Sequence, residues 1–196
     1  MSRRSSETLK RSLFVGLLAG LLATVMLASA LLPTARAGAA TMPCGESNAA
    51  PSTLSLHVMR TSVLCLMNRV RVHHNLRPLT YNQDLKTSAS AHSVSMVVHG
   101  YFAHEGPGGS VDSRVSRSGY LAGNGAFTVG ENIAAGAGNQ GSPWQIFQDW
   151  MHSPPHRANI LDPHYRDAGV GVARGYPLGG GGDAATYTVD FGAVRN

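Results

Sequence analysis

Apolar residues recur at three- and four-residue steps between Leu54 and His73, a spacing that places them on one face of a helix. The repeating positions are Leu56, Met59, Val63, Leu66, Met67 and Val70. Ser52 or Thr53 can cap the start of this helix, and Asn75, with Pro78 shortly after it, ends the pattern. The first element of the fold is therefore expected to be an amphipathic helix.

A second helical pattern runs from Asn82 to Val98. The residues on its apolar face are Leu85, Ala89, His92 and Met96. His92 is therefore expected to point inward with them. The stretch from Ser110 to Gly119 predicts a short third helix, after which a glycine-rich loop leads to Glu131.

The segment Ser142-Pro143-Trp144-Gln145 has the composition of a helix start. Serine can cap the first turn, proline fits the first helical position, and Gln145 can return a hydrogen bond to the cap. The apolar residues that follow are Ile146, Phe147, Trp150 and Met151. This helix is expected to end before Pro154-Pro155, because proline interrupts a helix interior.

Residues 169–175 and 185–192 alternate or run apolar, as two strands would, and a glycine-rich loop from Pro177 to Ala184 joins them. Helices come first in the chain, and the two adjacent late strands are expected to pair antiparallel. This order predicts an α+β fold built in layers.

The N-terminus carries a separate signal. Basic residues precede a nearly pure apolar run over 12–32, and Ala35-Arg36-Ala37 supplies the small residues of a cleavage site. Residues 1–37 are therefore predicted to be a signal peptide that is removed on export, followed by an N-terminal arm over 38–53 and one domain over 54–196. The alternative is an uncleaved segment that anchors the protein in a membrane.

Charge and cysteine content fit an exported domain. Of 16 Lys and Arg residues and 11 Asp and Glu residues, five basic residues and one acidic residue lie within residues 1–37. The rest of the chain is nearly neutral and has no basic run, which argues against a nucleic-acid partner. Cys44 and Cys65 are expected to form a disulfide between the arm and the first helix, in an oxidising compartment.

Three separated segments each carry one side chain suited to metal binding or proton transfer, beside apolar residues that can hold it in place. These side chains are His104, Glu131 and His156. Two imidazoles and a carboxylate suit one divalent ion, such as zinc, with an open coordination position. The alternative is that both histidines simply hydrogen-bond Glu131 without a metal.

Other residues near these segments have competing interpretations. His92 either lines the cleft near His104 or is buried against a backbone carbonyl. Ser153 and His156 invite a hydrolase interpretation, but Pro154-Pro155 interrupts the helix that would align them. Ser153 is therefore expected to line the cleft and to cap a turn. Asn132 is expected to line the cleft and to help lock the segments that carry Glu131 and His156.

The order of these motifs resembles the bacterial secreted CAP-superfamily (SCP-like) domains, over about Leu54 to Ala193. CAP stands for cysteine-rich secretory, antigen 5 and pathogenesis-related proteins. The motifs that carry the resemblance are Leu66-Met67-Asn68-Arg69, Ala91-His92-Ser93, Tyr101-Phe102-Ala103-His104, Gly130-Glu131-Asn132-Ile133, Trp150 to Leu161, Gly169-Val170-Gly171-Val172 and Val189-Asp190-Phe191-Gly192.

The resemblance implies a three-layer α-β-α sandwich with a central antiparallel sheet. It also implies a cleft with two histidines and two acidic residues, in some members around a divalent ion. His104, Glu131 and His156 match three of these positions, and Ser153 stands where eukaryotic members have the second acid.

The expected protein is thus a secreted SCP-like domain whose His/Glu cleft binds an extracellular or cell-envelope ligand, a lipid being one candidate, with no membrane span after signal cleavage. The alternative is a metal-assisted hydrolase, protease- or esterase-like, with Glu131 as general base and His156 as the second catalytic candidate. The sequence leaves open which of the two applies. Absence of the second acid favours binding.

Overall fold

The computed structural model describes residues 44–123, 125–179 and 182–195. The predicted signal peptide over 1–37 and the first part of the arm lie outside these residues. The helices are a short 3-10 turn η1 (Pro51–Thr53), α1 (Leu56–His73), α2 (Gln83–His99), α3 (Val111–Arg117), a second 3-10 turn η2 (Gly138–Gly141), α4 (Pro143–His152) and α5 (Pro154–Leu161). The strands are β1 (Thr80–Tyr81), β2 (Ala126–Ala137), β3 (Asp167–Arg174) and β4 (Ala184–Arg195). None of the helices in the described ranges has the length and apolarity that a membrane crossing requires.

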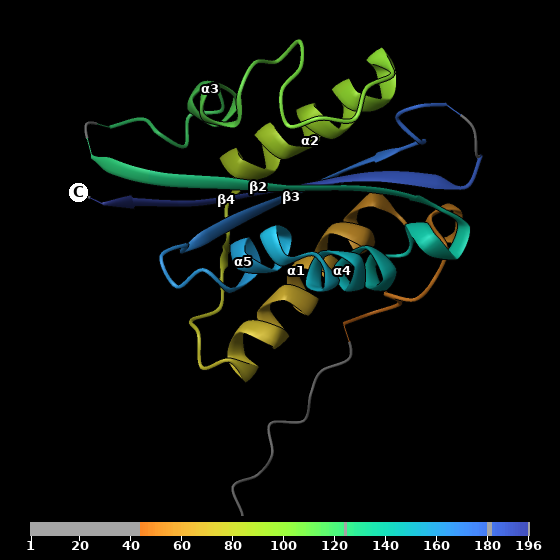
Figure 1. Ribbon diagram of the computed structural model, residues 1–196, viewed down its shortest axis with the longest axis horizontal. Helices are drawn as coiled ribbons and strands as arrows, with labels where there is room; N and C mark the ends of the chain where they lie inside the picture. The colour runs from red at the N-terminus through yellow and green to blue at the C-terminus, as the bar shows by residue number, and fades with distance from the viewer. Residues whose placement is uncertain (1–43, 124, 180–181, 196) are drawn as a thin grey trace, which may run out of the picture. The chain divides into compact units, whose positions relative to one another are not determined.

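One sheet forms the middle layer, with the strand order β1-β3-β4-β2. β4 pairs antiparallel with β2 on one side and with β3 on the other. The two-residue β1 pairs parallel with β3, so the sheet is mixed at that edge. α2 and α3 cover one face, and α1, α4 and α5 cover the other (Figure 1). The predicted α-β-α sandwich is confirmed.

The helix starts follow local hydrogen-bonding chemistry. Asn82 accepts hydrogen bonds from the first turn of α2, and Ser142 accepts one from the backbone of Gln145 at the start of α4. The cap of α1 is Ser55 rather than Ser52 or Thr53, because η1 occupies the two earlier positions. Gln145 does not return a bond to its cap, since its side chain donates to Asp149 instead.

Two of the elements that were not expected, β2 and α5, carry residues of the site. β2 is a twelve-residue strand in the region predicted to be a glycine-rich loop leading to Glu131. α5 begins at Pro154, directly after α4, because proline is compatible with the first helical turn, where its missing N–H is not needed. The proline pair therefore ends one helix and starts the next.

Two glycines allow α2 to lie directly on the sheet. A Cβ atom added at Gly169 would collide with the backbone of Leu85 and Lys86, and one at Gly171 with the backbone of Ala89. Helix and strand thus pack backbone against backbone. This contact fixes the height of α2, and with it His92, above β3 and β4.

Cys44 and Cys65 form the predicted disulfide, with 5.6 Å between their Cα atoms, and tie the arm to α1. The bond closes a loop with a sequence separation of 21 residues. Replacing Cys65 by serine is expected to lower the free energy of unfolding by about 3 kcal/mol, because the unfolded chain regains that loop's freedom. Urea denaturation measures the difference. The wild-type protein in a reductant serves as control and should match the variant. Equal stability of all three samples would contradict the prediction.

Candidate functional site

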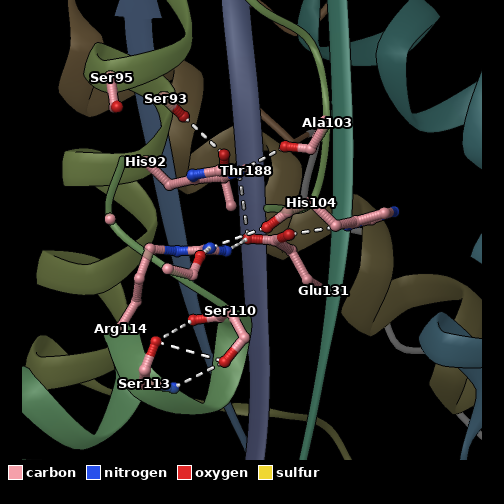
Figure 2. A network of polar contacts seen from close by, with 12 residues as sticks. His92, Ser93, Ser95, Ala103, His104, Ser110, Ser113, Arg114, Glu131 and Thr188 are labelled. Carbon is pink, nitrogen blue, oxygen red and sulfur yellow. Dashed lines mark hydrogen bonds and ion pairs between the residues drawn. The ribbon is translucent and has the colours of Figure 1, made fainter. Parts of the chain in front are cut away.

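Glu131 is the centre of a buried polar network on the face of the sheet that α2 and α3 cover (Figure 2). Its Oε1 accepts a hydrogen bond from His104 Nδ1 at 2.7 Å, and its Oε2 accepts one from Arg114 Nη2. Both carboxylate oxygens are thus engaged, one by an imidazole and one by a guanidinium. The structure brings His104 and Glu131 together from distant parts of the chain.

Arg114 completes this network, although no sequence motif indicated it. It lies on α3 and is buried, and its Nη1 donates to the carbonyl oxygens of His104 at 2.8 Å and Gly109 at 2.7 Å. One guanidinium therefore holds both the Glu131 carboxylate and the loop that carries His104. The preceding Ser110 helps to place it by capping α3 through the backbone of Ser113.

His92 combines both of the roles considered for it. It is buried on α2, its Nε2 donates to the carbonyl oxygen of Ala103 at 3.0 Å, and the same atom lies 3.8 Å from Glu131 Oε2. Burial lowers the pKa of His92 and outweighs the effect of the Glu131 carboxylate. A neutral imidazole thus supports the His104 loop from beneath.

His156 approaches β2 from the opposite layer, on α5. Asn132 Nδ2 donates to the carbonyl oxygen of His156 at 3.0 Å. Asn159 Nδ2 donates to the carbonyl oxygen of Glu131 at 3.1 Å and to Asn132 Oδ1 at 2.9 Å. These bonds tie α5 to β2. Ser153 precedes α5 but, contrary to expectation, its side chain makes no capping hydrogen bond.

The three predicted metal ligands do not fit one closed coordination shell. Among the described residues, no group of three His, Cys, Asp or Glu side chains is placed to hold a metal ion. Glu131 is committed to His104 and Arg114, and the guanidinium opposes a second cation there. Burial, and then the positive charge of His104, lower the pKa of His156.

Asp190 is a second buried carboxyl at this site. It lies on β4 directly opposite Glu131 in the register of the two strands and is fully buried. Neither of its oxygens has a hydrogen-bond partner among the described residues. Burial and the neighbouring Glu131 carboxylate raise the pKa of Asp190 well above its usual range. Burial thus favours the protonated form of Asp190, whereas Arg114 favours the charged form of Glu131.

A cavity of about 220 Å³ borders this network between α2 and α3. Its walls include Ser88 and His92 of α2 and Arg114 and Arg117 of α3. The polar network is thus open to solvent on two sides. One opening is this cavity between α2 and α3, and the other is at His104, whose side chain is half exposed.

The profile described as "CAP: Cysteine-rich secretory protein family" matches residues 64–191, which include every residue of this network. The chain belongs to the CAP family. YkwD of Bacillus subtilis is 36% identical over 127 residues, which cover 64% of this chain and 46% of YkwD. YlbC, a membrane protein of the same organism, is 34% identical over 116 residues, covering 58% of this chain and 31% of YlbC. This CAP chain therefore spans less than half of either relative.

Solved structures agree with the family. An extracellular SCP-domain protein from Bacillus anthracis has a TM-score of 0.57 at 28% identity, over 73% of this chain and 44% of that one. An outer surface protein from Borrelia burgdorferi has a TM-score of 0.56 at 16% identity, over 68% of this chain and 90% of that one. The second likeness concerns the fold alone.

The His104–Glu131 contact of this CAP domain predicts a pH-dependent stability. The hydrogen bond to Glu131 raises the pKa of His104, despite burial, so its contribution is fully present below its ordinary pKa of 6.5 and is lost as the pH rises through the folded value. Burial alone would raise the pKa of Glu131. The hydrogen bond from His104 and the charge of Arg114 lower it by more than burial raises it, so the pKa lies below its ordinary value of 4.5. The carboxylate therefore contributes above pH 4.5 and loses this contribution as the pH falls through the folded value.

The stability advantage of the wild-type protein over His104→Gln should thus be greatest between about pH 4.5 and 6.5 and should shrink at higher pH. Glutamine keeps a donor but cannot gain a charge. Urea denaturation at half-unit pH steps measures the difference. An advantage that grows as the pH rises above neutrality would contradict the assignment.

Proposed function

We propose that this CAP domain is an exported binding module that holds an extracellular or cell-envelope ligand against His104. The proposal rests on the hydrogen bonding and the exposure of this imidazole. Its Nδ1 is fixed by Glu131 at 2.7 Å, while 52% of its side chain is exposed. A half-exposed ring that a buried carboxylate orients and keeps more basic suits a ligand that presents an acceptor or a negative charge.

Three features support export. The N-terminal residues 1–37 have the order of a signal peptide, Cys44 and Cys65 form a disulfide, and a similar solved structure is that of an extracellular protein. An uncleaved segment over 12–32 would instead anchor the domain at the membrane surface. Both arrangements expose the domain outside the cytoplasm.

The metal-assisted hydrolase is the second candidate, and the geometry disfavours it. A general base needs a free oxygen within reach of a water molecule and a pKa near the working pH. Both oxygens of Glu131 are occupied, and its pKa is lowered. Ser153 stands where eukaryotic members have the second acid, and the other carboxyl of the site, Asp190, is fully buried.

A binding and turnover panel tests the proposal. The protein is co-sedimented with peptidoglycan and with phosphatidylglycerol vesicles, and titrated with casein-derived peptides. At least one probe should bind the wild-type protein and lose affinity for His104→Ala. His73→Ala, which removes an exposed histidine at the end of α1, is the matched control and should bind normally. Failure of all three probes, or equal binding by His104→Ala, would overturn the proposal.

The same protein is then assayed with peptide, ester and peptidoglycan substrates in the presence of zinc. No turnover is expected. Turnover that disappears in both Glu131→Gln and His156→Ala would establish the hydrolase instead.

Zinc binding is expected to be weak. With Glu131 held by Arg114, only the imidazoles of His104 and His156 remain from the predicted ligand set, and two ligands are a poor zinc site. Calorimetry above pH 7 should give a small heat for the wild-type protein and none for His104→Ala. His57→Ala, which changes an exposed histidine on α1, should behave as the wild type. Tight binding by the wild-type protein would contradict the described role of Arg114.

A further inference from the structure

β2 leaves one edge of the sheet open, since it is the last strand in the order β1-β3-β4-β2. Gly192 O accepts from Arg166 N and Ala184 O accepts from Gly175 N, so even-numbered residues of β4 turn their backbone groups toward β3. The odd-numbered residues of β4 therefore face β2, where they pair with even-numbered residues. It follows that odd-numbered residues of β2 direct their N–H and C=O groups outward.

The two halves of this outer edge differ. In the middle of β2, Asn159 Nδ2 caps the carbonyl oxygen of Glu131 at 3.1 Å, and Trp150 Nε1 caps that of Ile133 at 3.0 Å. At Phe127 and Val129, the described residues supply no partner for the outward N–H and C=O groups. Figure 1 shows this half of β2 along the front of the sheet with no ribbon before it.

The open half also lacks the usual protection of an edge strand. Natural edges are blunted by lysine, proline, bulges or a covering element. The stretch Ala126-Phe127-Thr128-Val129-Gly130 contains neither lysine nor proline and pairs with β4 without a bulge. The one charged side chain nearby, Glu131, turns inward to Arg114. An unprotected edge that is short and next to His104 is consistent with use in binding.

We propose that the ligand is an extended peptide that adds a strand to β2 at Phe127–Glu131 and passes His104. This inference rests on the proposed binding function and names the chemical class of its ligand. Peptide N–H groups donate to the carbonyl oxygens of Phe127 and Val129, and peptide carbonyls accept from the N–H groups of Phe127, Val129 and Glu131. Main-chain bonds of this kind provide affinity for any extended sequence.

A hollow beside the open edge provides a place for a peptide side chain. It measures about 520 Å³, and Phe127, Leu121 and Ser113 are among the residues that line it. Phe127 as a whole residue is 48% exposed. Selectivity of the site therefore comes from side chains that contact Phe127 at one end and His104 at the other.

A second copy of this chain fits the edge less well than a peptide. The open stretch is confined between the start of β2 at Ala126 and the capped carbonyl of Glu131. Pairing over so few residues buries far less than the roughly 1,200 Å² of a stable protein interface. A single extended segment, by contrast, needs only this length.

The test uses a blocked hexapeptide of alternating Thr and Val, and two analogues N-methylated at alternate residues so that each loses the N–H donors of one edge. Amide spectra of the isotope-labelled protein should show changes at Phe127, Val129 and Glu131. One analogue should bind about tenfold more weakly or worse than the other, because only one edge faces β2. Equal affinity of the two analogues, or changes confined to other residues, would overturn the peptide assignment.

Protein variants provide the second arm. Val129→Pro removes an outward N–H without touching the pairing with β4, and should weaken hexapeptide binding about tenfold, while the control Val129→Thr should bind normally. Should the proline variant not fold, the methylated analogues still decide the question. Self-association of the protein that Val129→Pro abolishes would instead assign the edge to a second copy.

Different results would overturn the proposed ligand binding at His104 and the proposed peptide pairing with β2. A probe that needs His104 but is indifferent to Val129→Pro would remove the peptide and keep the binding site. Hexapeptide binding that needs Val129 but not His104 would keep the peptide edge and overturn the role of His104.

Discussion

Replacing Arg71 by methionine is expected to lower the free energy of unfolding by about 4 kcal/mol. Arg71 lies on α1 and is fully buried. Its guanidinium donates to the carbonyl oxygens of Arg77, Ile160, Asp162 and Tyr165, at 2.8 to 3.4 Å. Methionine fills much of the same volume but removes this shared donor. Only the carbonyl oxygen of Tyr165 keeps a side-chain partner, Arg166 Nη1, so the segment that joins α5 to β3 is released.

Urea denaturation of both proteins measures this effect. Arg69→Met is the matched control, since Arg69 is exposed on the same helix, and it should change stability by less than about 0.5 kcal/mol. Equal losses in the two variants would show that the buried guanidinium has no special part in the fold.

Replacing Arg114 by methionine is expected to destabilise the protein by a similar amount, about 4 kcal/mol, because it leaves one oxygen of the buried Glu131 carboxylate without its guanidinium partner. The carbonyl oxygens of His104 and Gly109 lose their donor as well. Arg117→Met changes an exposed arginine on the same helix and should cost less than about 0.5 kcal/mol.

The double variant Arg114→Met with Glu131→Gln separates charge from packing. Without the buried charge, the loss on removing Arg114 should be smaller than in the wild-type background. Thermal and urea denaturation of all four proteins give the interaction energy. Additive losses would contradict the view that the guanidinium acts mainly on Glu131.

The helices could be predicted because local chemistry alone determines them. The apolar face from Leu56 to Val70, the Asn82 cap and the Ser142-Pro143 start all act within a few residues of the element they define. The strands of residues 169–175 and 185–192 were likewise visible from their apolar runs, and β3 and β4 include nearly all of them. The cap of α1 was misplaced by two or three residues because several serines and threonines stand together there.

β2 escaped prediction because its strand character depends on its neighbours. Gly130 and Gly136 have little intrinsic preference for a strand, and Asn132 has none. They are extended because each of the twelve residues of β2 pairs with β4. In addition, Tyr165 lies so close to Gly130 that no other backbone conformation fits there. Single-sequence patterns contain no trace of such partners.

The residues of the site also divide into those that the local sequence reveals and those that depend on distant partners. His104, Glu131 and His156 stood out because their residue types are scarce and chemically distinctive. Arg114 and Asp190 did not, because an arginine in a short helix and an aspartate in a strand are both common on surfaces. Asp190 does interrupt an apolar strand, and a carboxyl group within a buried run is the signal that could have identified it.

The glycines at positions 169 and 171 have a consequence for adaptability. Because no side chain separates α2 from β3 at these glycines, the helix and the strand are expected to move as one rigid unit. A bound molecule is then not accommodated by sliding of the helix. Adjustment is left to the span from Gly100 to Gly109, which carries His104 between the end of α2 and the start of α3. Proteins that share this rigid contact between α2 and β3 are therefore expected to differ in ligand preference through residues 100–109, where substitutions leave the packing of the layers unchanged.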